Sequence, residues 1–289
     1  MEFAALALPL ALGIIMFGLG LDLTPGDFVR IARQPKAAAV ALACQLFLLP
    51  AIAFGLVILF RLPPILAVGM LLLAASPGGT TANLYSHLFR GDVALNISLT
   101  AINSIIAVVT LPILTNLAIA VFQPGDLSVG LQFAKTLEVF LIVLVPVALG
   151  MTVRAMKPAF AEAMDRPVRI ASVAILVLVI AGSVASSFDL LASNFLLLGG
   201  IATVFCGLSL TVGYVVPRLF RIEKSQAVAS AFEVGIHNAT LAIVIAQGVL
   251  GRPDMSLPAA VYGVLMFPIA ALFGLWVTRR QTAAPGEMS

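Results

Sequence analysis

The sequence predicts an all-α integral membrane protein with nine transmembrane helices. Three observations predict this fold class: the composition, nine apolar segments of membrane-crossing length, and polar interruptions inside two of them. Hydrophobic residues make up 61% of the 289 residues and charged residues only 10%, and the mean hydropathy is +1.13. A soluble domain carries about 25% charged residues. The chain therefore has too little polar surface to face water on all sides.

The nine apolar segments lie at approximately 4–21, 37–60, 65–89, 93–122, 132–153, 168–187, 195–217, 225–250 and 257–278. Each is close to or longer than the roughly 20 residues that a helix needs to cross a bilayer. The first segment lacks a basic leader and a small-residue cleavage site, so we interpret it as a retained span rather than a signal peptide. The polar connections are longest near 22–36 and 154–167, and we expect residues 1–289 to form a single transmembrane domain.

The basic residues predict the orientation of the chain. When the connections are assigned alternately to two sides, 13 of the 16 Lys and Arg residues fall on one side and 3 on the other. The 13 are Arg30, Arg33, Lys36, Arg90, Arg154, Lys157, Arg166, Arg169, Arg218, Arg221, Lys224, Arg279 and Arg280, and the 3 are Arg61, Lys135 and Arg252. Cytoplasmic loops carry the excess of Lys and Arg. We therefore expect a multi-pass protein of the inner (plasma) membrane, with the N-terminus outside and the C-terminus in the cytoplasm. The positive charge then faces the lipid bilayer, and no nucleic-acid partner is expected.

Two segments contain residues that break a helix. The third has the run Ser-Pro-Gly-Gly-Thr-Thr-Ala-Asn at 76–83, and the eighth has Glu-Val-Gly-Ile-His-Asn at 233–238. Unwound backbone in hydrocarbon costs several kcal/mol for each unpaired group, so such breaks are tolerated where they line a polar cavity. A pair of breaks at corresponding places in two halves of a chain indicates the binding site of a secondary transporter.

The spacing of the breaks predicts an internal repeat. The breaks are about 157 residues apart, and the starts of the first and sixth spans are about 163 apart. Spans one to four, at about 4–122, therefore line up with spans six to nine. The second repeat covers spans five to nine, at about 132–278, and leaves span five unpaired. Because an odd number of spans separates the paired elements, we expect an inverted-topology repeat with two broken helices.

The breaks also contain the residues that are best suited to chemistry. A charged side chain at mid-bilayer costs roughly 2.5–3.5 kcal/mol on insertion scales, which makes Glu233 a functional-site candidate. Amides at the helix restart near Thr80 suit an anion, and carbonyls that end the preceding half-helix suit a cation. Glu233 and His237 are one turn apart and could act as an acid/base pair, but no nucleophile motif such as GxSxG accompanies them.

Motifs along most of the chain carry a family resemblance. They are Met16–Leu21 with Pro25 to Phe28, Gln45 before Pro50, Pro77–Thr80 with Asn83, Arg90–Leu95, and Glu233–Gly235 with Asn238. They resemble the bile acid:sodium symporter family, a branch of the bile/arsenite/riboflavin transporter superfamily. The resemblance implies a core domain of spans two to four and seven to nine, in which the broken helices cross. It also implies a panel domain of about spans one, five and six.

The resemblance further implies sodium sites. The first would use Asn83, Asn96, Thr100 and Glu233 with a carbonyl near Ala82, and the second Gln45, Glu233, the carbonyls of Val234 and Ile236, and position 237. The family typically has Gln at that position, whereas this chain has His237, and a neutral imidazole is a poor Na⁺ ligand. Three readings stay open: the second sodium is lost, a proton replaces it, or His237 donates to Glu233 or substrate while carbonyls hold Na⁺. We expect one or two Na⁺.

The resemblance places the substrate below the crossing, between core and panel, at Thr80, Thr81 and Asn238, with His237 as a further candidate. It implies a monomeric carrier that couples sodium to symport of an organic anion by alternating access. Bile-acid-like, pantoate-like and 2-oxo acids are open, because the run at 264–269 lacks the His-Asn pair often carried by members that take bile acids. The alternatives are a proton-coupled organic anion carrier or exporter of the same superfamily, and an intramembrane hydrolase.

Overall fold

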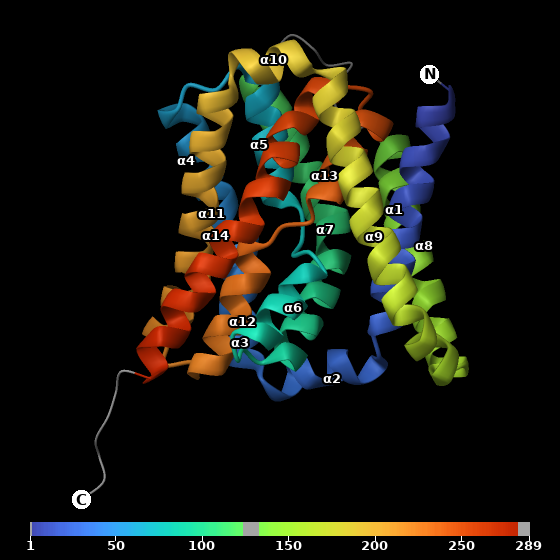
Figure 1. Ribbon diagram of the computed structural model, residues 1–289, viewed down its shortest axis with the longest axis vertical. Coiled ribbons are helices and arrows are strands. Elements are labelled where there is room, and N and C mark those ends of the chain that lie inside the picture. The colour runs from blue at the N-terminus through green and yellow to red at the C-terminus, as the bar shows by residue number, and fades with distance from the viewer. Residues whose placement is uncertain (1, 124–132, 283–289) are drawn as a thin grey trace, which may run out of the picture.

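The computed structural model describes residues 2–123 and 133–282, and these residues are almost entirely helical (Figure 1). Five helical segments are long and apolar enough to cross a membrane: Pro35–Leu59, Val93–Phe122, Pro158–Ser186, Phe195–Leu219 and Pro253–Arg279. Shorter apolar helices cover Pro9–Asp22, Pro64–Ala75, Leu141–Met156 and Ala239–Val249. The chain is an all-α membrane protein, as the composition predicts. The count of nine spans stays a prediction. Residue 132, with which the predicted fifth span begins, lies outside the described residues.

The outer faces of the helices are suited to lipid. Helix α7 (Val93–Phe122) exposes Ile105, Val109, Ile113 and Leu117 to between 46% and 60% of their surface. These residues recur every four positions and form one stripe along the helix. A stripe of exposed branched apolar side chains is unfavourable in water but is favourable against hydrocarbon. The multi-pass membrane assignment thus has a structural basis as well as a compositional one.

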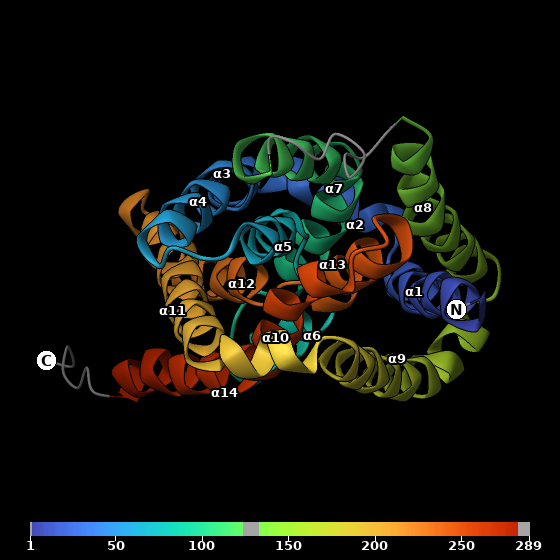
Figure 2. The ribbon, with the colours of Figure 1, turned by 90° about the horizontal axis from the view of Figure 1, so that it is seen from above.

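Three helices lie side by side at one edge of the molecule: α1 (Glu2–Asp22), α8 (Phe133–Met156) and α9 (Pro158–Ser186) (Figures 1 and 2). Gly20 and Gly150 let α1 and α8 touch, because a Cβ at Gly20 would lie 2.2 Å from the Val147 carbonyl oxygen. These helices correspond to the predicted panel, and the division into domains stays a prediction. The polar connection at 154–167 is helical except at Lys157, where α8 gives way to α9.

The remaining helices surround the two broken segments (Figure 2). One span consists of α3 (Pro35–Ala43), the π-helical η1 (Cys44–Leu48) and α4 (Leu49–Leu59), and the others are α7, α11 (Phe195–Leu219) and α14 (Leu257–Thr282). Helix α10 (Phe188–Ser193) and the 3-10 turn η3 (Pro253–Ser256) are short connecting elements, and α2 (Pro25–Arg33) links α1 to α3 across the lower surface of the molecule in Figure 1. In the same view, α1 begins at the upper end and α14 ends at the lower end.

The broken segments cross at the centre. The first is α5 (Pro64–Ala75) followed by α6 (Thr81–Leu88), and the second is α12 (Lys224–Gly235) followed by α13 (Ala239–Val244) and the π-helical η2 (Ile245–Val249). Gly78 and His237 form an isolated antiparallel bridge. The Gly79 amide donates to the Ile236 carbonyl at 2.7 Å, and the Asn238 amide donates to the Pro77 carbonyl at 2.9 Å. Each break therefore supplies partners for backbone groups of the other, which explains how both are tolerated inside a membrane.

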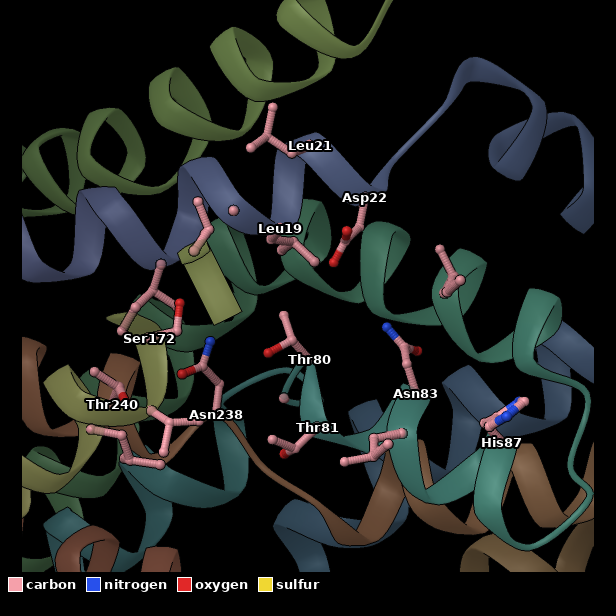
Figure 3. Close-up of a pocket in the computed structure, with 18 of the residues that line it drawn as sticks. Leu19, Leu21, Asp22, Thr80, Thr81, Asn83, His87, Ser172, Asn238 and Thr240 are labelled. Atoms are coloured by element: carbon pink, nitrogen blue, oxygen red, sulfur yellow. The ribbon is translucent and has the colours of Figure 1, made fainter. Parts of the chain in front are cut away.

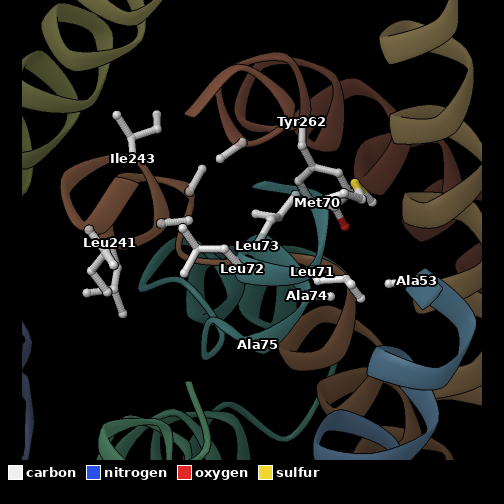
Figure 4. Close-up of a cluster of buried hydrophobic side chains, with 14 of the residues drawn as sticks. Ala53, Met70, Leu71, Leu72, Leu73, Ala74, Ala75, Leu241, Ile243 and Tyr262 are labelled. Carbon is white, nitrogen blue, oxygen red and sulfur yellow. The ribbon is translucent and has the colours of Figure 1, made fainter. Parts of the chain in front are cut away.

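The core around the crossing is apolar and closely packed. Leu72 and Leu73 of α5 pack in one cluster with Leu241 and Ile243 of α13 and with Tyr262 of α14 (Figure 4). All of these side chains are at most 2% exposed. Inside a membrane, the van der Waals packing of such side chains and the hydrogen bonds between the breaks hold the two broken segments together.

The same helix-ending turn occurs twice at a constant spacing. Arg61 and Arg221, 160 residues apart, have φ angles of 52° and 58°, and each follows the same pattern of backbone hydrogen bonds. Arg90 and Gly251, 161 residues apart, have φ angles of 59° and 65°. In the described ranges these four are the positive-φ positions. These spacings lie between the 157 and 163 residues read from the sequence, and the inverted repeat stays a prediction.

Candidate functional site

Glu233 lies fully buried at the end of α12, where three segments of the chain meet. Its carboxylate accepts hydrogen bonds from Thr100 Oγ1 at 2.5 Å and Asn103 Nδ2 at 2.9 Å, both on α7, and from the backbone of Gly78. A Cβ at position 78 would lie 2.4 Å from the carboxylate carbon. Only glycine at that position therefore allows the first break to reach Glu233.

The helices around Glu233 contain buried amide oxygens without a donor: Asn83 Oδ1 on α6, and Asn96 Oδ1 and Asn103 Oδ1 on α7. The Asn96 amide nitrogen donates to the Ala229 carbonyl at 2.7 Å, one turn before Glu233, and leaves its oxygen unpaired. Buried acceptors without partners are costly and call for an explanation. Oxygens that cannot donate, beside a carboxylate, are the ligands that a hard cation prefers. The chemistry of this group of residues thus fits Na⁺.

Asn103 is absent from the predicted set, although it touches Glu233 directly. It follows Thr100 by three residues and Asn96 by seven, so all three share one face of α7. Extension of the Asn96–Thr100 spacing by one turn would have found it. The described residues hold no group of three or more His, Cys, Asp or Glu side chains that could bind a metal ion.

Gln45 and His237 meet on the other side of the crossing, at the Ser76 carbonyl. Gln45 Nε2 donates to this oxygen at 3.0 Å, and His237 Nδ1 lies 3.3 Å from it. Because a carbonyl only accepts, Nδ1 carries the hydrogen and Nε2 bears the lone pair. The imidazole stacks on Phe205 with ring centroids 5.5 Å apart and meets Tyr262 edge-on at 5.4 Å.

The residues predicted for a second sodium are only partly brought together. The Ile236 carbonyl already accepts from the Gly79 amide, and Gln45 and His237 donate to the Ser76 carbonyl and not to the Glu233 carboxylate. Gln45 Oε1 and His237 Nε2 are buried without a partner. Val234 is fully buried at the end of α12.

A cavity of about 570 Å³ lies between the crossing and helices α1 and α9. It is lined by all four residues predicted for substrate, Thr80, Thr81, His237 and Asn238 (Figure 3). Asn238 Oδ1 accepts from the Leu241 amide and caps α13, which leaves its amide nitrogen for a ligand. Asn83 also lines this cavity, so the candidate ion and substrate sites share a residue.

Other residues of the cavity were not among those that the sequence analysis named for the substrate site. Ser172 on α9 and Thr240 on α13 add hydroxyls, and Asp22, at the end of α1, adds a carboxylate (Figure 3). Exposed Asp22, His87 and Glu162 line the cavity near the lower surface, where α2 lies. Glu162 also pairs with Arg154 at 3.8 Å. The cavity therefore reaches solvent at that surface.

Nearer the upper surface, α9 presses against the chain that follows α13. Ser183 Oγ hydrogen-bonds Ser256 Oγ, which also accepts from Gln247 Nε2 at 2.9 Å. One turn further, Ser187 donates to Asp254 at 2.7 Å. Below them, a Cβ at Gly263 of α14 would lie 3.2 Å from Ile180. These contacts close the cavity from the upper side.

The model of the sodium bile acid symporter family matches residues 9–194. The chain belongs to this family. It is 30% identical over 253 residues to the uncharacterized sodium-dependent transporter YocS of Bacillus subtilis. The aligned region covers 88% of this chain and 77% of YocS. It is 25% identical over 281 residues to the ileal sodium/bile acid cotransporter of Homo sapiens, with coverages of 95% and 79%.

A third relative differs more from this chain in length. The probable chloroplastic sodium/metabolite cotransporter BASS1 of Arabidopsis thaliana is 29% identical over 271 residues, with 92% of this chain but only 65% of that protein covered. The family and these relatives are transporters. The chain is accordingly a transporter and not an enzyme, which excludes the intramembrane hydrolase.

Proposed function

We propose that the protein is a sodium-coupled symporter of an organic anion that works by alternating access. The observation that carries the proposal is the buried Glu233 carboxylate among unpartnered amide oxygens, next to a polar cavity. Sodium would bind Glu233 with Thr100 and the oxygens of Asn83, Asn96 and Asn103. Sodium dependence is also part of the names of the bacterial and human relatives.

The path from ion to substrate is short. Gly78 touches the Glu233 carboxylate, and the next three residues, Gly79, Thr80 and Thr81, line the cavity. Asn83 lies on α6 one turn further and carries one of the unpartnered oxygens. An ion bound there would hold the first turn of α6 in place. That turn forms one wall of the substrate cavity, so binding of one ligand favours binding of the other.

The cavity suits an anion of small-molecule size. Its volume of about 570 Å³ lies in the usual range of 300–1,000 Å³ for ligand pockets. Threonine and serine hydroxyls and the Asn238 amide are neutral donors that can hold a carboxylate without an ion pair. Arg154 and His87 line the cavity as well. Bile-acid-like, pantoate-like and 2-oxo acids are the classes to be tested.

Alternating access is supported by the difference between the two ends of the cavity. It reaches the lower surface and is closed toward the upper surface by the contacts of Ser183 and Ser187 with the chain after α13. The basic residues assign the lower surface to the cytoplasm. The structure is then an inward-facing state, and the outward-facing state requires those contacts to separate.

The test combines thermal stability and uptake for the wild type and Glu233→Gln. Sodium should raise the melting temperature of the wild type relative to equal K⁺, since a ligand of the folded state stabilises it in proportion to ln(1 + [L]/Kd). Glu233→Gln should stay folded, lose that shift, and lose sodium-driven uptake of the candidate acids into proteoliposomes. Full sodium-dependent uptake by this variant would refute the proposal. Uptake that persists without Na⁺ but collapses with the proton gradient would identify the proton-coupled carrier instead.

A further inference from the structure

We infer that this carrier binds one sodium ion per cycle, on the Glu233 side of the crossing, and that His237 closes the other side to a second ion. The inference rests on the proposed function and adds the ion number and the residue that sets it. It follows from a difference in hydrogen bonding between the two sides of the same pair of broken helices.

The Glu233 side offers acceptors. Its carboxylate is fully buried, and the amide oxygens of Asn83, Asn96 and Asn103 have no donor. In two of these asparagines, the amide nitrogen is fixed by a bond to Ala229 or Glu233, so the oxygen cannot exchange places with it without loss of that bond. Oxygens of this kind are the ligands that a hard cation bound beside Glu233 would take.

The His237 side offers donors and bonded carbonyls. The N–H groups of Gln45 and His237 both point at the Ser76 carbonyl. The carbonyls of Gly235 and Ile236 accept from Tyr262 Oη at 2.8 Å and from the Gly79 amide. The acceptors left without a partner on these side chains are one oxygen, Gln45 Oε1, and one nitrogen, His237 Nε2. Nitrogen is a poor ligand for a hard alkali ion, and these side chains then offer a second ion only one oxygen in place of its hydration shell.

Packing prevents the imidazole from turning away. His237 is 1% exposed, and its ring lies nearly parallel to Phe205, at 17°, with Tyr262 at its edge. A rotation that moved Nδ1 off Ser76 would leave that N–H unpaired in a buried apolar site, which is unfavourable. The ring therefore occupies the space in which a second ion and its ligands would lie.

One ion has a consequence for driving force. One Na⁺ moving with one monovalent anion carries no net charge, so the membrane potential neither drives nor opposes the step. Two ions would make the same transport carry one positive charge, so the membrane potential would act on it.

The experiment uses Na⁺ alone as the probe. Bound ²²Na⁺ per protein is measured at equilibrium, and melting temperature is followed as Na⁺ replaces K⁺ at constant ionic strength. The wild type should bind one ion with a Hill coefficient near one. His237→Gln replaces the ring by an amide whose oxygen can turn toward the ion, and should raise the count toward two and the Hill coefficient above one. Two ions in the wild type, or one ion in a folded His237→Gln variant, would overturn the inference.

Two matched amide replacements separate the sides. Asn103→Leu should weaken sodium binding by about tenfold or more, since it removes an oxygen and a partner of Glu233. Gln45→Met, which removes an amide of similar length on the other side, should leave the sodium constant within about twofold, with any loss of stability equal in K⁺ and in Na⁺. A tenfold loss in Gln45→Met would also overturn the inference. Absence of any sodium effect in the wild type would instead refute the proposed function, so the two failures are distinguishable.

Discussion

The lower and upper halves of α9 present the same face to the rest of the molecule but make different contacts. In the lower half, Ser172 and Leu176 line the cavity. In the upper half, Ile180 and Ser183 continue the stripe at helical spacing, Ser187 follows the last residue of the helix, and these residues contact α14 and η3. The difference shows that one surface serves both as a cavity wall and as a seal. The two halves would exchange these roles if the core moved along the helix.

The seal is built from contacts that can separate. Ser183, Ser256, Gln247, Ser187 and Asp254 are joined by hydrogen bonds, each worth about 0.5–1.5 kcal/mol net. The packing of α1 on α8 is different, because Gly20 and Gly150 bring backbone against backbone. Closely fitted backbones resist sliding, whereas small hydroxyls can exchange protein partners for water. This contrast favours movement at α9 and rigidity between α1 and α8.

The largest expected effect comes from locking the seal. Ser183→Cys combined with Ser256→Cys should form a disulfide on oxidation, because the two hydroxyls are in direct contact and native Cys44 and Cys206 are buried. Uptake should fall to background and return with reductant, while sodium still raises the melting temperature. Each single cysteine variant serves as the control. Undiminished uptake by the fully cross-linked protein would show that the upper contacts do not have to part.

A bulky side chain in the lower half should have the next largest effect. Ser172→Trp would fill part of the cavity and lower the apparent affinity for the transported acid by about tenfold or more. The sodium-dependent melting shift should stay, because Glu233 is untouched. Val177→Trp on the same helix, where Val177 is 60% exposed, is the control and should transport normally. Equal losses in both variants would contradict the assignment of this face.

Removal of one hydroxyl from the seal should shift the balance of states moderately. Ser183→Ala leaves Ser256 with Gln247 as a partner, so the loss is one hydrogen bond of about 1 kcal/mol. That is about fivefold in the equilibrium between states. The measurement is the rate at which an impermeant maleimide added outside labels a Thr240→Cys probe in the cavity. An unchanged rate would mean that this bond does not oppose opening.

The smallest effect is expected at the rim of the seal. Asp254 is partly exposed, and water can replace its bond from Ser187. Ser187→Ala should therefore change the same labelling rate by less than about twofold. A change larger than that of Ser183→Ala would reverse the order of the two contacts and place the main barrier at the surface.

The sequence was most informative where polar or helix-breaking residues stand inside apolar segments. Glu233, Pro77 and the paired glycines stand out in apolar runs, so both breaks could be located in advance, and the family resemblance added four residues that line the cavity. The helix over 158–167 was not specified in advance because its polar residues identified it only as a connection, although they lie at the end of a long span. Polar composition alone does not distinguish an exposed helix end from a connection.

The seal could not have been predicted in the same way. Ser183 and Ser256 are 73 positions apart, and a serine in an apolar run is common and carries little signal. Their contact depends on how α9 docks against the chain after α13, which is a tertiary property. Asn103 is an intermediate case, because the helical spacing of Asn96 and Thr100, extended by one turn, would have found it. Residues that act through contacts between distant parts of the chain can be identified only from the three-dimensional structure.

The three arginines that end helices at positive φ have a practical consequence for protein engineering. L-residues occupy this region at a cost of about 1 kcal/mol, which glycine does not incur. Glycine at Arg90 or Arg221 would relieve the strain but would remove charge from the side that basic residues assign to the cytoplasm. In the orientation that the basic residues predict, Arg61 lies on the opposite side, so we expect Arg61→Gly to raise the melting temperature without removing a cytoplasmic charge. A carrier purified for crystallisation would gain stability from this substitution without any change where its broken helices cross.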